Sequence, residues 1–120
     1  MAADRAMPAF TKSPPELVER FGAVAARHPE GQVRKMFGYP ALFVGGNLTT
    51  GLFADRWMIR LAEADRAELL GLPGAGPFEP MAGRSMKGYG LLPPDVVADD
   101  VELDRWLERA IAFVRTLPAK

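Results

Sequence analysis

The residue types that carry most enzymatic chemistry are scarce in this chain of 120 residues. It contains a single histidine, His28, two serines, Ser13 and Ser85, and no cysteine. Nucleophilic catalysis needs a nucleophile beside a base that a third group orients. Ser13 and His28 are instead interpreted as the cap and the end of one helix. We therefore expect no catalytic residues and no enzyme. The lack of cysteine also excludes thiol catalysis and zinc–thiolate sites.

Acidic residues are concentrated between positions 95 and 104. Negative side chains stabilise the start of a helix, and Asp99 with Glu102 forms a D-x-x-E capping box. Their spacing does not follow the pattern of a calcium loop, so we predict helix capping and no metal site. Gly74 and Gly76 precede Pro77 rather than a helix, and they lack the G-K-[ST] ending of a phosphate-binding loop. We predict no cofactor.

Four basic residues form the candidate patch for an anion or an acidic partner: Arg34, Lys35, Arg84 and Lys87. Strand alternation places Arg34 and Lys35 on opposite faces, so only one of them can join Arg84 and Lys87. The other interpretation is a solvated strand edge whose charges discourage aggregation. Because 15 basic residues balance 15 acidic ones, a general electrostatic attraction to nucleic acid is not expected.

Four methionines are a second candidate for a binding surface, because methionine repacks easily around different partners. They are Met36, Met58, Met81 and Met86. At strand spacing the competing interpretation is that they belong to the core.

A run of short strands must position these residues. Apolar and β-branched residues cluster between turn signals at Gly38-Tyr39-Pro40, at Gly45-Gly46-Asn47 and at Asp55-Arg56. The pattern predicts strands over about 33–37, 41–44, 48–54 and 57–61, with a last strand over 86–92. Gly51 indicates a bulge or a close packing contact. Trp57, Ile59 and Leu61 alternate with polar or smaller positions and share one face.

Helices must cover that face, because a meander cannot bury its apolar side alone. The S-x-x-E box at Ser13 predicts a helix to about Arg27. A short helix is expected over residues 63–70, and a last one over 101–117. Trp106 and Phe113 widen the apolar face of that last helix beyond what a small sheet needs. We take these two as a candidate interface, which favours a homodimer.

Length and composition predict one domain over residues 1–120, with 1–12 as a loose lead-in. Hydrophobic residues make up 48% of the chain and charged residues 25%, as in ordinary globular proteins. The N-terminus lacks the apolar stretch of a signal peptide, and no run approaches a membrane span. We expect a cytoplasmic protein with no membrane partner.

The order of these motifs resembles the N-terminal domain of the TfoX/Sxy competence regulators. The similarity runs through Arg34-Lys35-Met36-Phe37-Gly38, Trp57-Met58-Ile59-Arg60-Leu61 and Met81-Ala82-Gly83-Arg84-Ser85-Met86-Lys87-Gly88-Tyr89, and it covers about residues 32–117. Full-length regulators continue into a C-terminal helical domain, so the resemblance is to a stand-alone domain.

The resemblance implies an α+β fold in which an antiparallel meander is flanked by N- and C-terminal helices, similar to the type III secretion chaperone class. It also implies a bacterial, cytoplasmic protein without catalysis or cofactor. We expect a small regulatory or adaptor domain that acts through protein–protein interaction. One alternative is a DNA- or RNA-associated transcriptional regulator that uses the basic patch. The other is a small-anion-binding protein that uses Arg84 and the Pro/Gly-rich loop.

Overall fold

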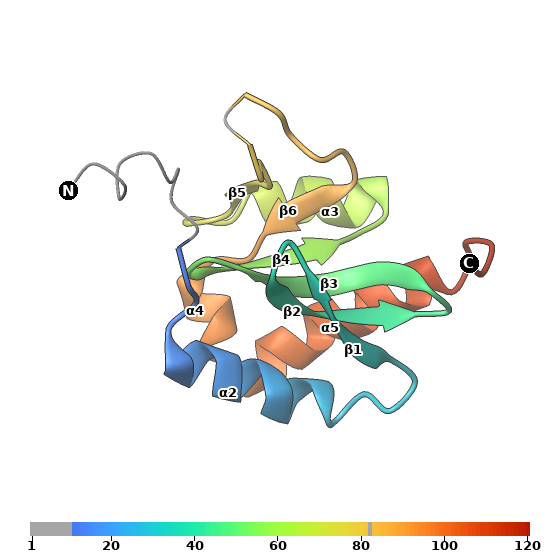
Figure 1. Ribbon diagram of the computed structural model, residues 1–120. Coiled ribbons are helices and arrows are strands. Elements are labelled where there is room, and N and C mark those ends of the chain that lie inside the picture. The colour runs from blue at the N-terminus through green and yellow to red at the C-terminus, as the bar shows by residue number, and fades with distance from the viewer. Residues whose placement is uncertain (1–10, 82) are drawn as a thin grey trace.

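Residues 11–81 and 83–120 are described by the computed structural model, and their strands form one six-stranded antiparallel sheet (Figure 1). The strand order is β1-β2-β3-β4-β6-β5. The strands are β1 (Gln32–Met36), β2 (Tyr39–Val44), β3 (Asn47–Phe53), β4 (Arg56–Arg60), β5 (Gly76–Pro77) and β6 (Tyr89–Leu91). The predicted α+β meander is therefore confirmed. The predicted lead-in lies outside the described residues, except for Thr11 and Lys12.

Three helices cover one face of the sheet: α2 (Pro15–Ala25), α4 (Pro94–Val97) and α5 (Asp100–Val114) (Figure 1). A further helix in the described part of the chain, α3 (Glu63–Leu70), follows β4 and packs against β6. Within the described residues, none of the helices combines the length and the apolar character needed to cross a membrane.

The main core lies between the sheet and these helices. Trp57, Ile59 and Leu61 all belong to it, which confirms the predicted alternation along β4. Phe21 of α2 packs on Trp57 with ring centroids 5.1 Å apart. The indole Nε1 of Trp57 donates to Thr50 Oγ1 at 2.8 Å, so the one polar atom of this buried ring is satisfied.

The opposite face of the sheet is apolar as well, but a loop rather than a helix covers it. Buried Met58 and Phe78 form its centre, together with Ala41 and Leu48. Phe78 belongs to the loop, and Met86 returns to it through a hydrogen bond from Met86 N to Phe78 O at 2.9 Å. We call this side the outer face, and residues 78–81 and 83–86 the outer loop.

Local signals in the sequence correctly predicted several turns and caps. Gly45 and Gly46 join β2 to β3 with φ of 60° and 80°, as a type I′ hairpin requires. Asp99 caps α5 by accepting from the backbone N–H groups of Val101 and Glu102. A Cβ atom on Gly51 would lie 2.9 Å from the Cβ of Ala41, so this glycine marks a close packing contact.

Other local predictions were wrong. The N-cap of α2 is Pro14 rather than Ser13. The Ser13 hydroxyl donates to Ala54 O at 2.6 Å and does not accept a hydrogen bond from the start of the helix as a cap would. The predicted last strand shrinks to β6, since Met86 turns back to the outer loop. Pro94 begins the short helix α4, where only the end of a strand was expected; proline suits a first helical turn.

Candidate interaction groove

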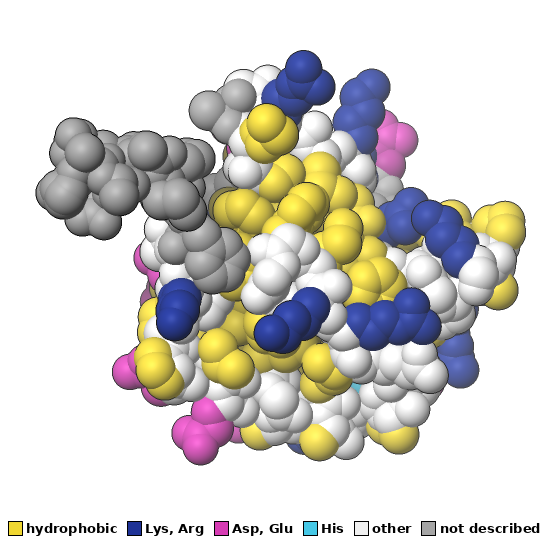
Figure 2. All heavy atoms as spheres, in the orientation of Figure 1, with side chains coloured by type: hydrophobic (Ala, Val, Ile, Leu, Met, Phe, Trp, Pro, Cys, Tyr) yellow, Lys and Arg dark blue, Asp and Glu magenta, His cyan; other side chains and the backbone are white. Residues whose placement is uncertain are grey.

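A groove of about 670 Å³ opens on the outer face, between the β1–β2 turn and the outer loop. In Figure 2 hydrophobic side chains gather in this part of the surface, and Lys and Arg side chains lie around them. Most of the residues that line the groove are apolar. The full set of lining residues is Thr11, Phe37, Tyr39, Phe53, Ala54, Pro80, Met81, Arg84, Ser85 and Met86.

Phe37 forms one wall of the groove from a conformation that disfavours it. Phe37 and Gly38 occupy the two-residue turn between β1 and β2, with φ of 57° and 83°. A type I′ turn of this kind prefers Asn-Gly, and a bulky residue at positive φ is an outlier. The Phe37 side chain nevertheless stays 48% exposed. Backbone strain of this kind tends to cluster at functional sites.

Aromatic rings continue from Phe37 across the outer face. Phe37 meets Phe53 edge to face at a centroid distance of 5.7 Å. Phe53 packs on Phe78 at 5.3 Å, and Phe78 on Tyr89 at 6.3 Å. The Phe53 ring, which lines the groove, is thus part of a connected aromatic cluster.

Residues 11–13 close one end of the groove. The Tyr39 hydroxyl donates to Thr11 O. The Ser13 hydroxyl donates to the carbonyl oxygen of Ala54, and Ala54 has a positive φ of 54°. These contacts tie the N-terminal end of the described chain to the β1–β2 and β3–β4 turns.

The outer loop supplies the second wall. Arg84 N donates to Met81 O at 2.8 Å, which closes the tip of the loop. Met81 is 67% exposed, whereas Met86 is half-buried and Met58 is buried beneath it in the same apolar cluster. The core interpretation therefore holds for Met58. Met81 and Met86 line the groove, and their role as an adaptable binding surface stays a prediction.

Arg84 is the single charged residue among those lining the groove. Its side chain is exposed, and it forms no ion pair within the described part of the chain. Glu79 of the same loop accepts a hydrogen bond from Ser85 Oγ at 3.2 Å. The groove thus combines an apolar floor with one unneutralised guanidinium group.

The four predicted basic residues do not share one pocket. Arg34 lies over the ring of Phe43 at 5.4 Å, whereas Lys35 lines a hollow on the other side of β1 with Lys12. Arg84 lines the groove. Lys87 lines a separate hollow beside Tyr89. Strand alternation separates the first two, and the outer loop separates the last two.

Trp106 is buried within the chain, so the predicted exposed interface on α5 is wrong for this residue. It is 4% exposed and belongs to the main core, with the guanidinium of Arg109 4.5 Å from its ring centroid. The wide apolar face of α5 packs against the sheet and against α4. Phe113 is half-buried, 6.0 Å from the Arg60 guanidinium, and its role in an interface stays a prediction.

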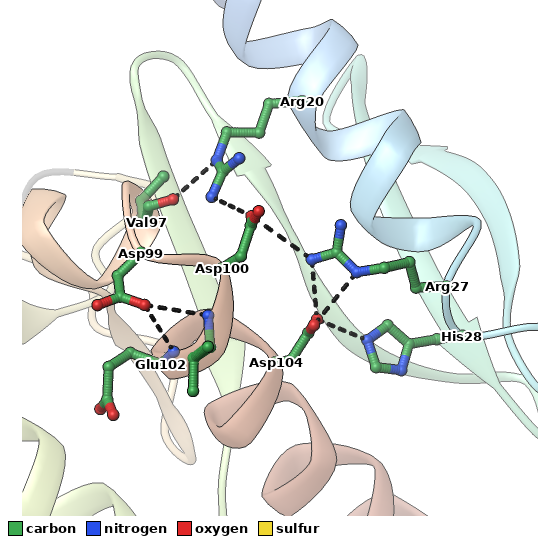
Figure 3. A network of polar contacts seen from close by, with 9 residues as sticks. Arg20, Arg27, His28, Val97, Asp99, Asp100, Glu102 and Asp104 are labelled. Carbon is green, nitrogen blue, oxygen red and sulfur yellow. Dashed lines mark hydrogen bonds and ion pairs between the residues drawn. The ribbon is translucent and has the colours of Figure 1, made fainter.

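His28 belongs to a polar network between α2 and α5, away from the groove (Figure 3). Its Nε2 lies 3.2 Å from Asp104 Oδ1, and Arg27 Nη2 lies 3.0 Å from the same oxygen. Arg20 Nη2 lies 2.9 Å from Asp100 Oδ1. Burial alone would raise the pKa of Asp104, but the hydrogen bonds and charges of Arg27 and His28 outweigh it and lower that pKa. The network joins the two helices.

Sequence reasoning missed Phe37 and Phe53 as groove residues. Phe37 was assigned to a strand, because Gly38-Tyr39-Pro40 resembles a turn by composition. The available signal was a phenylalanine directly before a glycine, at the end of a strand where Asn-Gly would suit a hairpin. No local signal predicts that the outer loop would fold back over Phe53.

Residues 16–114 match the family model described as the TfoX N-terminal domain. Comparison with curated proteins gave no match. Comparison with solved structures gave none either.

Proposed function

The chain belongs to the TfoX N-terminal domain family, and on that premise we propose that it is a non-enzymatic regulatory or adaptor domain that binds a protein partner through the groove. The family supports a regulatory type of domain. The partner, the binding surface and the absence of catalysis are the parts that we add.

The observation that carries the proposal is the exposed apolar surface at Phe37 and Met81. These side chains are 48% and 67% exposed and lie on opposite walls of one groove. Exposed apolar patches with a polar rim commonly mark interaction sites. Phe37 keeps this exposure at a positive φ, although Asn at the same position would relieve the backbone.

The placement of the nucleophile and base candidates favours binding over catalysis. His28 is buried and pairs with Asp104. The Ser13 hydroxyl donates a hydrogen bond to Ala54 O, and the Ser85 hydroxyl donates one to the Glu79 carboxylate. Neither serine has the histidine as a hydrogen-bond partner, so the arrangement that activates a serine is not formed by these residues.

Site-specific photo-crosslinking in the host cell tests the proposal. A benzoylphenylalanine residue at Met81 should give a discrete adduct with a second protein. The matched control is Val101, which is 66% exposed and lies on α5; it should give no such adduct. The purified partner should then bind less tightly to the Phe37→Ala variant. Equal adducts from both positions, or an affinity that does not depend on Phe37, would remove the proposal.

Single-stranded nucleic acid is a second candidate, favoured by one observation. Arg34 lies over Phe43 at 5.4 Å and Arg60 over Tyr89 at 5.5 Å. Positive charge beside aromatic rings is the usual composition of single-strand binding surfaces. Fluorescence anisotropy with a labelled DNA strand should then show binding that falls steeply with salt and with Arg34→Glu. No binding at low salt would exclude this candidate.

A further inference from the structure

We propose that the groove binds an extended peptide in which a large apolar residue stands beside an acidic one. The apolar side chain would enter between Phe37 and Met86, and the carboxylate would pair with Arg84. This inference names the partner chemistry of the proposed interaction site, and it rests on that proposed function.

The apolar half of the inference follows from the floor and walls of the groove. Phe53 supplies a flat ring that is held by Tyr39 at 5.1 Å and by Phe78 at 5.3 Å. Met81 and Met86 are flexible and polarizable, so they can adjust to the shape of an inserted side chain. A rigid aromatic floor with adaptable walls favours one large apolar anchor, as in interface hot spots.

The acidic half follows from charge. Arg84 lines the groove without an ion pair among residues 11–81 and 83–120. Tyr39 is shared between the groove and the adjoining hollow, which is lined by Lys12 and Lys35. A ligand that leaves the groove over Tyr39 would therefore meet further positive charge. A carboxylate on an apolar segment complements this arrangement, and guanidinium binds carboxylate with two parallel hydrogen bonds.

The open walls favour a peptide over an enclosed small molecule. Small-molecule sites bury most of their ligand, whereas Met81 and Arg84 are exposed on the lip of this groove. A second copy of the chain is disfavoured by symmetry. An isologous dimer would use the same patch on both subunits, and the described residues that line the groove include no carboxylate to pair with Arg84 of the other copy.

The test uses a matched set of labelled short peptides with one leucine-phenylalanine centre and flanks of glutamate, glutamine or lysine. We expect the glutamate peptide to bind about tenfold more tightly than the lysine peptide at low salt. Arg84→Glu should reverse that order. Arg105→Glu, an equal charge change on the exposed face of α5, should leave it unchanged. The preference should fade near 1 M salt, where the Debye length is about 3 Å.

Several results would overturn this inference without touching the proposed function. If the peptides bind equally, or none binds while the Met81 crosslink to a partner still depends on Phe37, then the partner is a protein of other chemistry. If decanoate displaces the labelled glutamate peptide and binds with the same affinity as that peptide, the ligand is a small carboxylate. Loss of the Met81 crosslink itself would remove the proposed function instead.

Discussion

His28 Nε2 lies 3.2 Å from Asp104 Oδ1, and this partly buried contact links the turn after α2 to α5. Arg27 reaches the same carboxylate with two nitrogens, at 3.0 Å and 3.2 Å. Asp104 is therefore the shared acceptor of two neighbouring donors that directly follow α2. Its position explains a histidine that is buried and has no role in the groove.

Replacing Asp104 by Asn should lower the free energy of unfolding at neutral pH by about 1–3 kcal/mol, because His28 and Arg27 lose a charged acceptor. The pKa of Asp104 is lowered in the folded state from the ordinary 3.8. Its contribution to stability is thus present above pH 3.8 and is lost as the pH falls through the folded-state pKa. The variant should show a smaller acid-dependent loss of stability, measured by urea unfolding at several pH values.

Asp100→Asn is the matched control for that change. The Asp100 side chain is 64% exposed, against 30% for Asp104. Its ion pairs with Arg20 and Arg27 are therefore more strongly screened by solvent and should contribute only about 0.2–1 kcal/mol. Equal losses for the two variants would contradict the central place of Asp104 in the network.

Two glycines should respond in opposite directions to alanine. A Cβ on Gly51 would lie 2.9 Å from Ala41 Cβ and 3.1 Å from Met58 Cε, so Gly51→Ala should destabilise by about 1–3 kcal/mol through overpacking. Gly22 lies within α2 and a Cβ there would meet nothing within 4 Å. Gly22→Ala should therefore stabilise by about 0.5–1 kcal/mol. Thermal unfolding compares both, and a stable Gly51→Ala would mean that the outer face is loosely packed.

Arg60 should control the ionisation of Tyr89. Burial raises the pKa of the Tyr89 phenol above its ordinary 10.0, and the charge and hydrogen bond of Arg60 oppose that rise. Arg60→Gln should therefore raise the phenol pKa further. The stability contributed by the neutral phenol is present below pH 10.0 and is lost as the pH rises through the folded-state pKa. Tyrosinate absorbance measures the titration, and the Tyr89→Phe variant identifies which part of the absorbance change comes from Tyr89. An unchanged or lower Tyr89 pKa in Arg60→Gln would refute the coupling.

The sheet and its inner face were predictable from the sequence because they depend on local periodicity. Trp57, Ile59 and Leu61 alternate along one strand, and Gly45-Gly46 has the positive φ values that a tight hairpin needs. Asp99 caps its helix through neighbours only two and three positions away. In each case the residues that fix the structure lie close together in the chain.

The groove was only partly predictable, because it is made by segments far apart in the chain. Arg84 and the methionines were singled out by residue type, but the β1–β2 turn was placed one residue late, which left Phe37 in a strand. The Ser13 hydroxyl contacts Ala54 O across 41 positions, and His28 contacts Asp104 across 76. Residue type does not indicate such partners, so Ser13 was assigned to a helix cap.

Phe37→Asn should separate the stability of the fold from binding in the groove. Asn-Gly is the preferred pair for the type I′ turn, so the change relieves a residue with φ of 57°. The loss of the edge-to-face contact with Phe53 costs about 0.5–1.5 kcal/mol. The two effects oppose each other, and the net change in the free energy of unfolding should stay within about 1 kcal/mol.

Binding of the glutamate-flanked peptide should nevertheless fall about tenfold in Phe37→Asn, because one wall of the groove loses its ring. Phe37→Ala serves as the comparison: it removes the same ring but keeps a residue that disfavours positive φ, so it should be less stable than Phe37→Asn at equal loss of affinity. Urea unfolding and fluorescence anisotropy measure the two quantities on the same samples. A loss of several kcal/mol in Phe37→Asn would show that Phe37 is retained for packing on Phe53, and the groove would lose its argument from exposure.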